Sequence, residues 1–216
     1  MLKLATIPGV HRLGQAGFSG APAIAPSGTA PLWQLFAPGQ LIELSGRAPG
    51  KLSAVVRLIA RAQAEQEPVA WVGMREAACF YPPDFACAGV DLAALAVVRL
   101  ADAAGALGVV RAAEMLLRSG AFGLVILDLA RGVPKGELSW QARLSGLLRR
   151  HDARAVVLTE SEREQPSLGP LVSMRIEPCW REGKGKRVLL EQTLLKSKLG
   201  GRVGVSPDLR ALPAGA

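Results

Sequence analysis

The chain has 216 residues, half of them hydrophobic, which suits a single α/β domain with an ample core. No segment approaches the roughly 20 apolar residues of a membrane-spanning helix, and the two histidines, His11 and His151, are not clustered as a zinc site requires. The formal net charge is +8, and the segment from Arg175 onward contains nine basic residues and four acidic ones. This basic end is suited to binding a phosphate backbone or an acidic partner surface. An equally good interpretation is that these charges are solvated and keep the protein soluble.

The cysteines indicate a reducing compartment. Cys79, Cys87 and Cys179 are odd in number and form no C-x-x-C pair, so we expect reduced thiols in a cytoplasmic protein. The first apolar run is broken by Pro8 and Gly9, which does not fit a signal peptide.

The predicted elements follow an irregular arm at residues 1–34 that is rich in Gly, Pro, Ala and Ser. A strand is predicted at 41–44, and helical spacing of apolar residues predicts a helix over 51–66. Residues 75–91 are expected to mix helix and turn, with a break at Pro82-Pro83. The later elements, in chain order after the strand at 69–72, are a strand at 95–98, a helix at 106–120, a strand at 124–128, a helix at 137–150, and strands at 155–159, 171–176 and 187–192.

Apolar strands that alternate with helices predict an α/β fold, in which a mainly parallel twisted sheet is covered by helices on both faces. The core is expected over 35–192, and a basic C-terminal tail over 193–216. Ligands of such sheets bind at the carboxyl ends of the strands. The loop from Gly46 to Lys51, Glu76 after the second strand and Asp128 at the end of the 124–128 strand should therefore gather at one edge.

The stretch "LIELSGRAPGKLS", Leu41 to Ser53, nearly matches a phosphate-binding loop. Three residues separate Gly46 and Gly50 where the pattern G-x-x-x-x-G-K-[ST] has four, and Leu52 stands in place of the hydroxyl that binds magnesium. Ser53 comes one position late, and Pro49 removes a backbone donor. Nucleotide binding is therefore expected to be weak or absent, and hydrolysis absent or very slow.

The residues leave two readings of this site open. In the first, Lys51 contacts phosphate, Asp128 holds magnesium and Glu76 activates water, so that ATP and magnesium bind. In the second, which we favour, Gly46, Gly50 and Lys51 form a strand-to-helix turn and Asp128 is a structural strand end, so that no cofactor or metal is bound.

The order of segments resembles the core of RecA, the bacterial recombinase, over roughly residues 35–205. "GQLIELSGRAPGKLS" resembles its phosphate loop, "VAWVGMREA" with the following "AGVD" its strand bearing the catalytic glutamate, and "LLRSGAFGLVILD" its Walker B region. The resemblance implies a RecA-like P-loop core. It also places Glu160 where RecA has the glutamine that senses nucleotide.

The differences from RecA indicate which group of RecA-like proteins the sequence resembles most. The connections 129–138 and 160–170 are short where RecA has its two DNA-binding loops. A short, degenerate RecA core is similar to ImuA, the RecA-like accessory protein of the SOS mutagenesis cassette, and to SulA, the SOS-induced inhibitor of FtsZ. "VRAAEMLLRSGAFGLVILD" and "ARLSGLLRRHDARAVVLTE" resemble ImuA most.

This resemblance implies a non-catalytic scaffold of damage-induced translesion DNA synthesis. The implied partner is ImuB, with RecA, an error-prone DnaE-type polymerase and DNA as further candidates and no membrane contact. The alternatives are a weak ATPase of the RecA type and a SulA-like inhibitor of FtsZ-dependent division. Few aromatic residues are present for base stacking, so DNA would be bound through phosphates. The basic candidates for DNA or partner binding are Arg149, Arg150, Lys184, Lys186, Arg187, Lys196, Lys198 and Arg202.

Overall fold

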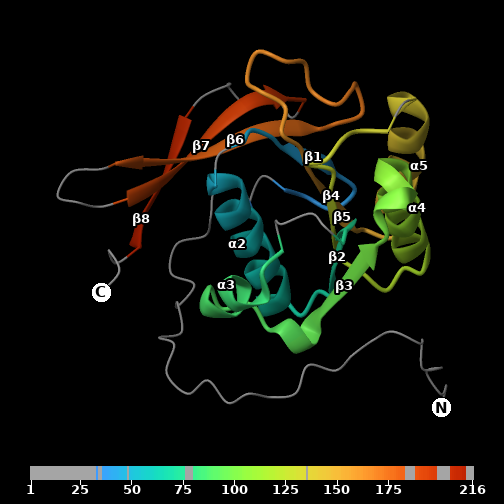
Figure 1. Cartoon of the computed structure of the whole chain (residues 1–216), viewed down its shortest axis with the longest axis horizontal. Coiled ribbons are helices and arrows are strands. Elements are labelled where there is room, and N and C mark those ends of the chain that lie inside the picture. The colour runs from blue at the N-terminus through green and yellow to red at the C-terminus, as the bar shows by residue number, and fades with distance from the viewer. Residues whose placement is uncertain are drawn as a thin grey trace.

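A computed structural model describes residues 33, 36–47, 49–75, 80–134, 136–182, 188–198 and 205–212. Within these residues, strands form one sheet with helices on both of its faces (Figure 1). The strands are β1 (Leu41–Leu44), β2 (Val69–Met74), β3 (Leu95–Leu100), β4 (Leu124–Asp128), β5 (Arg154–Leu158), β6 (Met174–Glu182), β7 (Val188–Ser197) and β8 (Val205–Leu212). The helices are α2 (Gly50–Ala64), α3 (Pro82–Cys87), α4 (Gly105–Arg118) and α5 (Glu137–Arg150), with short 3-10 turns at Leu92–Ala94 and Asp102–Ala104.

The strand order is β3-β2-β4-β5-β1-β6-β7-β8. The six strands from β3 to β6 are parallel, whereas β7 and β8 pair antiparallel. This confirms the predicted α/β class. The continuous apolar run of β4 is buried along its whole length, as expected of a strand covered on both faces.

Two apolar cores lie on the two faces of the sheet. On one face, α2 contributes Val55 and Ile59, which pack with Ile42 and Ile126. On the other, α4 and α5 cover alternate residues of the same strands, including Val125 and Val157. The alternation follows from the two-residue period of a strand, which sends neighbouring side chains to opposite faces.

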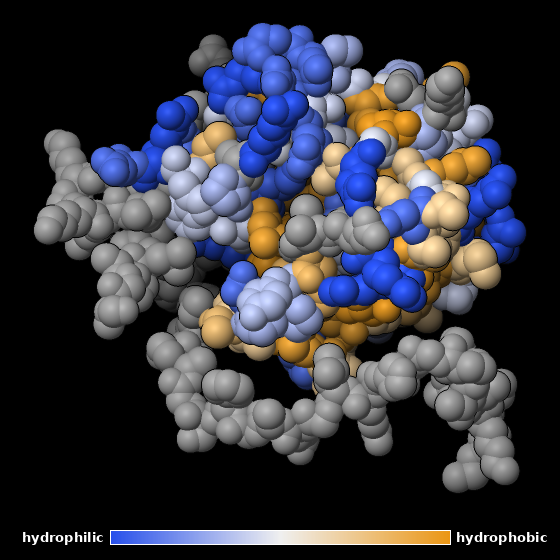
Figure 2. Space-filling view, in the orientation of Figure 1, coloured by the Kyte–Doolittle hydropathy of each residue, from blue (hydrophilic) through white to orange (hydrophobic). Residues whose placement is uncertain are grey.

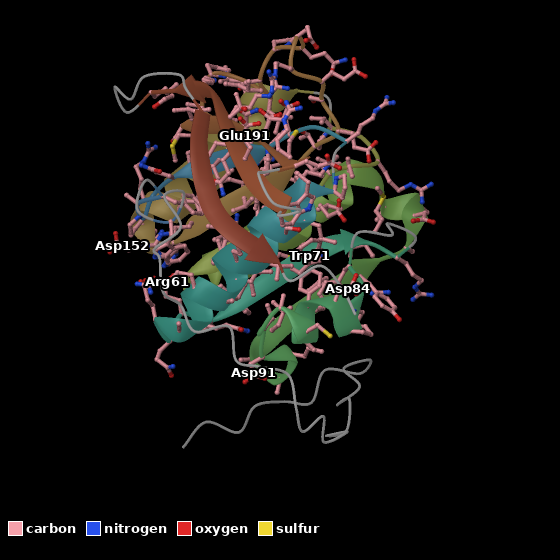
Figure 3. The ribbon with its side chains drawn as sticks, turned by 90° about the vertical axis from the view of Figure 1, so that its left-hand side faces the viewer. Arg61, Trp71, Asp84, Asp91, Asp152 and Glu191 are labelled. Atoms are coloured by element: carbon pink, nitrogen blue, oxygen red, sulfur yellow. The ribbon has the colours of Figure 1, made fainter. Side chains whose placement is uncertain are left out.

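A cluster of aromatic side chains joins β2 to α3. Trp71, labelled in Figure 3, is 2% exposed and meets the ring of Phe85 edge-on, with 5.5 Å between centroids. Phe80 lies 4.5 Å from Phe85. The expected mixture of helix and turn is present in the described part of 75–91, where the two prolines open α3. Proline suits the first turn of a helix, where its missing N–H would have no intrahelical partner.

The closing strands are longer than predicted. The strand predicted at 171–176 begins at Met174 and continues to Glu182. It extends beyond Ile176, where its pairing with β1 ends, because β7 pairs with it along its whole length. Strand β7 also runs past residue 192, and β8 pairs with it. The expected boundary between core and tail at 192–193 therefore falls inside a strand of the sheet.

Candidate functional site

The carboxyl ends of β4, β5 and β1 lie side by side, as predicted for the ligand-binding edge. Asp128 is in register with Leu158, which in turn is in register with Leu44. The near-match to a phosphate loop follows β1 directly, so the loop and Asp128 do belong to one edge of the sheet. Glu76, which activates water only in the first reading, lies outside the described residues.

The loop is bent by a glycine and leads into a helix without a side-chain cap. Gly46 has a φ of +98°, a backbone conformation that side chains disfavour. Helix α2 starts at Gly50 after Pro49, which makes no side-chain capping hydrogen bond. The backbone N–H of Ser45 donates to the carbonyl of Ile176 at 2.9 Å, so the first residue of the loop is bound to β6.

Strand β6 packs directly against the start of α2. A Cβ atom on Gly50 would lie 2.7 Å from the carbonyl oxygen of Pro178 and 3.0 Å from the Cα of Cys179. Such distances are shorter than any normal contact, so Gly50 is required here for close approach of two backbones. The glycine that the sequence suggested for a phosphate cradle has a packing role.

A carboxylate lies against the bend of the loop. A Cβ on Gly46 would sit 3.3 Å from both Cγ and Oε1 of Glu177. Arg163 donates to Oε2 of Glu177 through Nε at 2.8 Å and through its terminal nitrogen. The hydrogen bond and charge of Glu177 raise the pKa of Arg163. Arg163 offsets the charge of Glu177, but the carboxylate occupies the space beside the bend of the loop.

Lys51 is turned into the protein and is 7% exposed. Its Nζ donates to the backbone carbonyl of Thr159 at 2.6 Å, at the end of β5. The ammonium group thus satisfies a carbonyl at the end of a strand.

Asp128 is 1% exposed at the end of β4. Its Oδ1 accepts a hydrogen bond of 3.2 Å from the backbone N–H of Ala130, so it supports the turn that follows the strand. Ser53 lies half-buried on α2, and Glu160 is exposed just after Thr159. Of the predicted nucleotide residues, the structure places Gly46, Gly50, Lys51, Asp128 and Glu160 at this edge.

A buried polar network beside the loop was missed by the sequence analysis. Glu43 is 0% exposed, and its carboxylate accepts from the Thr159 hydroxyl at 2.9 Å and from the Leu168 N–H at 3.0 Å. Arg175 lies opposite Glu43 in the strand register, with 3.8 Å between Nε and Oε1. The available signal was an acidic residue between apolar neighbours in β1 and a basic residue between Met174 and Ile176 in β6.

The network fixes the connection from β5 to β6, residues 159–173. The guanidinium of Arg175 donates to the Ser45 hydroxyl at 2.9 Å and to backbone carbonyls of Ser161, Glu162 and Gln165. One side chain therefore joins the loop after β1 to the loop after β5.

The basic candidates do not form one surface among the described residues. Arg149 and Arg150 are exposed at the end of α5. Lys196 points inward, donating to the Ser167 hydroxyl at 3.0 Å and to the Gly169 carbonyl at 2.7 Å, and burial and the charge of Lys198 lower its pKa. Lys198 donates to the carbonyl of Pro170. The remaining candidates, which lie outside the described residues, are Lys184, Lys186, Arg187 and Arg202.

Metal clusters and membrane-spanning helices are both absent from the described part of the chain. No cluster of three or more His, Cys, Asp or Glu side chains there could hold a metal ion. None of the helices there has the length and apolar character needed to cross a bilayer.

Comparison with known proteins bears on the fold. No protein-family model matches the sequence, and no curated protein does so either. Among solved structures, the chain is similar to the RadB recombinase, with a TM-score of 0.59 and 16% sequence identity over 80% of this chain and 87% of that one. The chain therefore has the fold of a RecA-like core.

Proposed function

We propose that the protein is a non-catalytic, RecA-like scaffold of damage-induced translesion DNA synthesis that binds ImuB. Further candidate partners are RecA, the error-prone DnaE-type polymerase and DNA. The RecA-like fold supports the general class, and the resemblance of the α4–β5 sequence to ImuA supports the particular role. The observation that carries the non-catalytic part is the carboxylate of Glu177 against Gly46 in a loop one residue short.

Three features of the loop support this proposal together. Glu177, paired with Arg163, packs its carboxylate against Gly46, beside the place where a phosphate loop needs open backbone N–H groups. Lys51 donates to a protein carbonyl at 2.6 Å, a bond that nucleotide binding would have to break. Leu52 supplies no hydroxyl to a magnesium ion. Each lost charge-assisted bond is worth about 1.5–3 kcal/mol, so their joint loss disfavours a bound triphosphate.

The test of the non-catalytic part is a calorimetric titration of the full chain with ATP and magnesium, alongside ATPase assays of wild type and Lys51→Ala. We expect no binding heat, no change in melting temperature and identical background turnover. A ligand at 100 times its Kd would add about 2.7 kcal/mol of stability, which a melting experiment detects easily. Turnover that Lys51→Ala abolishes would establish the ATPase alternative.

The test of the partner is co-purification with ImuB. We expect a complex that survives gel filtration and does not require nucleotide. An FtsZ polymerisation assay with the same preparation tests the alternative that the protein inhibits cell division. Inhibition of FtsZ without an ImuB complex would refute the scaffold role.

A further inference from the structure

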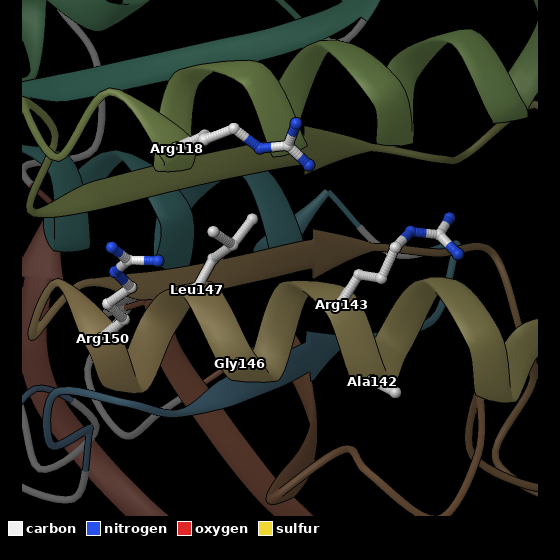
Figure 4. A pocket seen from close by; sticks show the side chains of 6 residues that line it. All are labelled: Arg118, Ala142, Arg143, Gly146, Leu147 and Arg150. Atoms are coloured by element: carbon white, nitrogen blue, oxygen red, sulfur yellow. The ribbon is translucent and has the colours of Figure 1, made fainter.

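A shallow depression lies between α4 and α5, on the opposite face of the sheet from α2 (Figures 1 and 4). Its volume is about 330 Å³. Arginine side chains from both helices surround it, while Leu147 lies between them. Its lining residues are Arg118, Ala142, Arg143, Gly146, Leu147 and Arg150.

Gly146 lines the depression without a side chain. Glycine is the least favourable residue of a helix interior after proline, and a glycine there usually permits close packing. Gly146 has no such reason, since a Cβ at this position would meet no atom within 4 Å. The bare backbone of α5 is therefore open to a group from outside the chain.

An apolar row runs along the same face of α5. Leu138, Ala142 and Gly146 follow one another at intervals of four residues, which places them in one line on the helix. Leu138 is 59% exposed, and Met115 on α4, one turn before Arg118, is 74% exposed. Figure 2 shows apolar and charged side chains interspersed over the α4–α5 side, at the right of the view.

Two of the three arginines that line the depression have no ion-pair partner among the described residues. Arg143 pairs with Glu114 at 2.7 Å, but neither Arg118 nor Arg150 forms an ion pair with any residue that the structure describes. Arg111 and Arg149 are also exposed on the two helices. Guanidinium groups bind carboxylates through paired hydrogen bonds, and their stems tolerate apolar neighbours.

We propose that the α4–α5 depression binds an acidic segment of a partner protein, with an apolar side chain seated over Gly146 and carboxylates paired with Arg118 and Arg150. This inference rests on the proposed scaffold function and supplies its docking surface. An acidic peptide with an apolar side chain fits better than nucleic acid, because the apolar lining residues Leu147 and Ala142 would gain nothing from phosphates. No aromatic side chain lines the depression to stack on a base.

The experiment uses the full chain and a fluorescein-labelled 12-residue peptide with two leucines flanked by aspartates and glutamates. Matched probes replace the leucines by serine, replace the acids by their amides, or use a 12-nucleotide single-stranded DNA. The variants are Gly146→Met, which fills the hollow without touching the core, and Arg118→Gln combined with Arg150→Gln. Arg57→Gln on α2, across the sheet, removes one charge as the control.

We expect anisotropy to show that the acidic leucine peptide binds more tightly than each matched probe. Affinity should fall about fivefold or more in the double arginine variant and in Gly146→Met, but not in Arg57→Gln. Equal binding of the serine peptide, tighter binding of DNA or no peptide binding would overturn the proposal.

Capture of ImuB by the same variants separates this inference from the proposed function. If wild type and Gly146→Met capture ImuB equally, the docking surface is wrong while the scaffold role stands. If wild type captures no ImuB, the scaffold role fails, and the peptide titration alone then decides whether the depression is a binding site.

Discussion

At the scale of single residues, the helix glycines have opposite surroundings. Gly50 is pressed against the backbone of β6, whereas Gly146 faces open space. Cys179 and Cys87 differ in the same way, since Cys179 is partly covered beside Glu177 while Cys87 is exposed on α3. Residue type alone predicts neither difference, because the neighbours come from distant parts of the chain.

Replacement of Gly50 and of Gly146 by alanine should change the free energy of unfolding in opposite directions. Gly50→Ala should lower the free energy of unfolding by about 1–3 kcal/mol, because a methyl group 2.7 Å from the Pro178 carbonyl forces the strand or the helix to shift. Gly146→Ala should raise it by up to about 1 kcal/mol, because alanine favours the helix and meets no atom. Urea denaturation of both variants measures the differences. A neutral Gly50→Ala would show that β6 does not constrain α2.

The cysteine pair gives a pH prediction. Burial raises the pKa of the Cys179 thiol, and Glu177 adds to the rise while Arg181 and Arg163 oppose it. The thiolate is the reactive form, so iodoacetamide should label Cys87 faster than Cys179 at pH 8, and the Cys179 rate should keep rising at higher pH.

The same shift has a consequence for stability. As pH rises through the ordinary thiol pKa, the unfolded chain releases its proton before the folded chain does, so this group lowers stability in that window. Fragmentation of labelled peptides by mass spectrometry distinguishes Cys87 from Cys179 and from the third cysteine, Cys79, and labelling in urea supplies the unfolded rate. Faster labelling of Cys179 in the native protein would contradict the assignment.

At the scale of elements, the spacing of apolar residues along the sequence was sufficient to predict most strands and helices. The runs at 41–44 and 124–128 have the predicted bounds because each is buried on both faces. The contacts between neighbouring strands could not be predicted from the sequence, because Glu43 and Arg175 meet only when β1 and β6 pair. The position of Glu177 against Gly46 was likewise unpredictable, because it depends on how far β6 extends past β1.

Arg175 should be among the most sensitive positions in the fold. Its removal leaves Glu43 buried and frees several carbonyls of the 159–173 connection. We expect Arg175→Met to lower the free energy of unfolding by about 3–5 kcal/mol, and to expose that connection to proteolysis. Glu43→Gln combined with Arg175→Met should be less harmful than the sum of the single changes, because the buried charge is then absent. Strict additivity would show that the two strands are not coupled through this pair.

At the scale of the whole molecule, the sheet order predicts how stability is distributed. Strands β4 and β5 have neighbours on both sides, and their residues are buried along their entire length. Strand β3 is an edge strand, and its side chains alternate between partly buried and exposed after Leu95. Native-state opening is easiest where few apolar groups are buried and backbone groups face water.

Hydrogen exchange followed by mass spectrometry measures this distribution. Amides of β4 and β5 should exchange only through global unfolding, so their protection should match the free energy from urea denaturation. Amides of β3 should exchange faster, because opening this edge breaks only its pairing with β2. In Arg175→Met, protection should fall first in β6 and in the connection before it, which that side chain joins to the rest of the sheet. Equal protection of β3 and β4 would contradict a stability gradient that runs from the centre of the sheet to this edge.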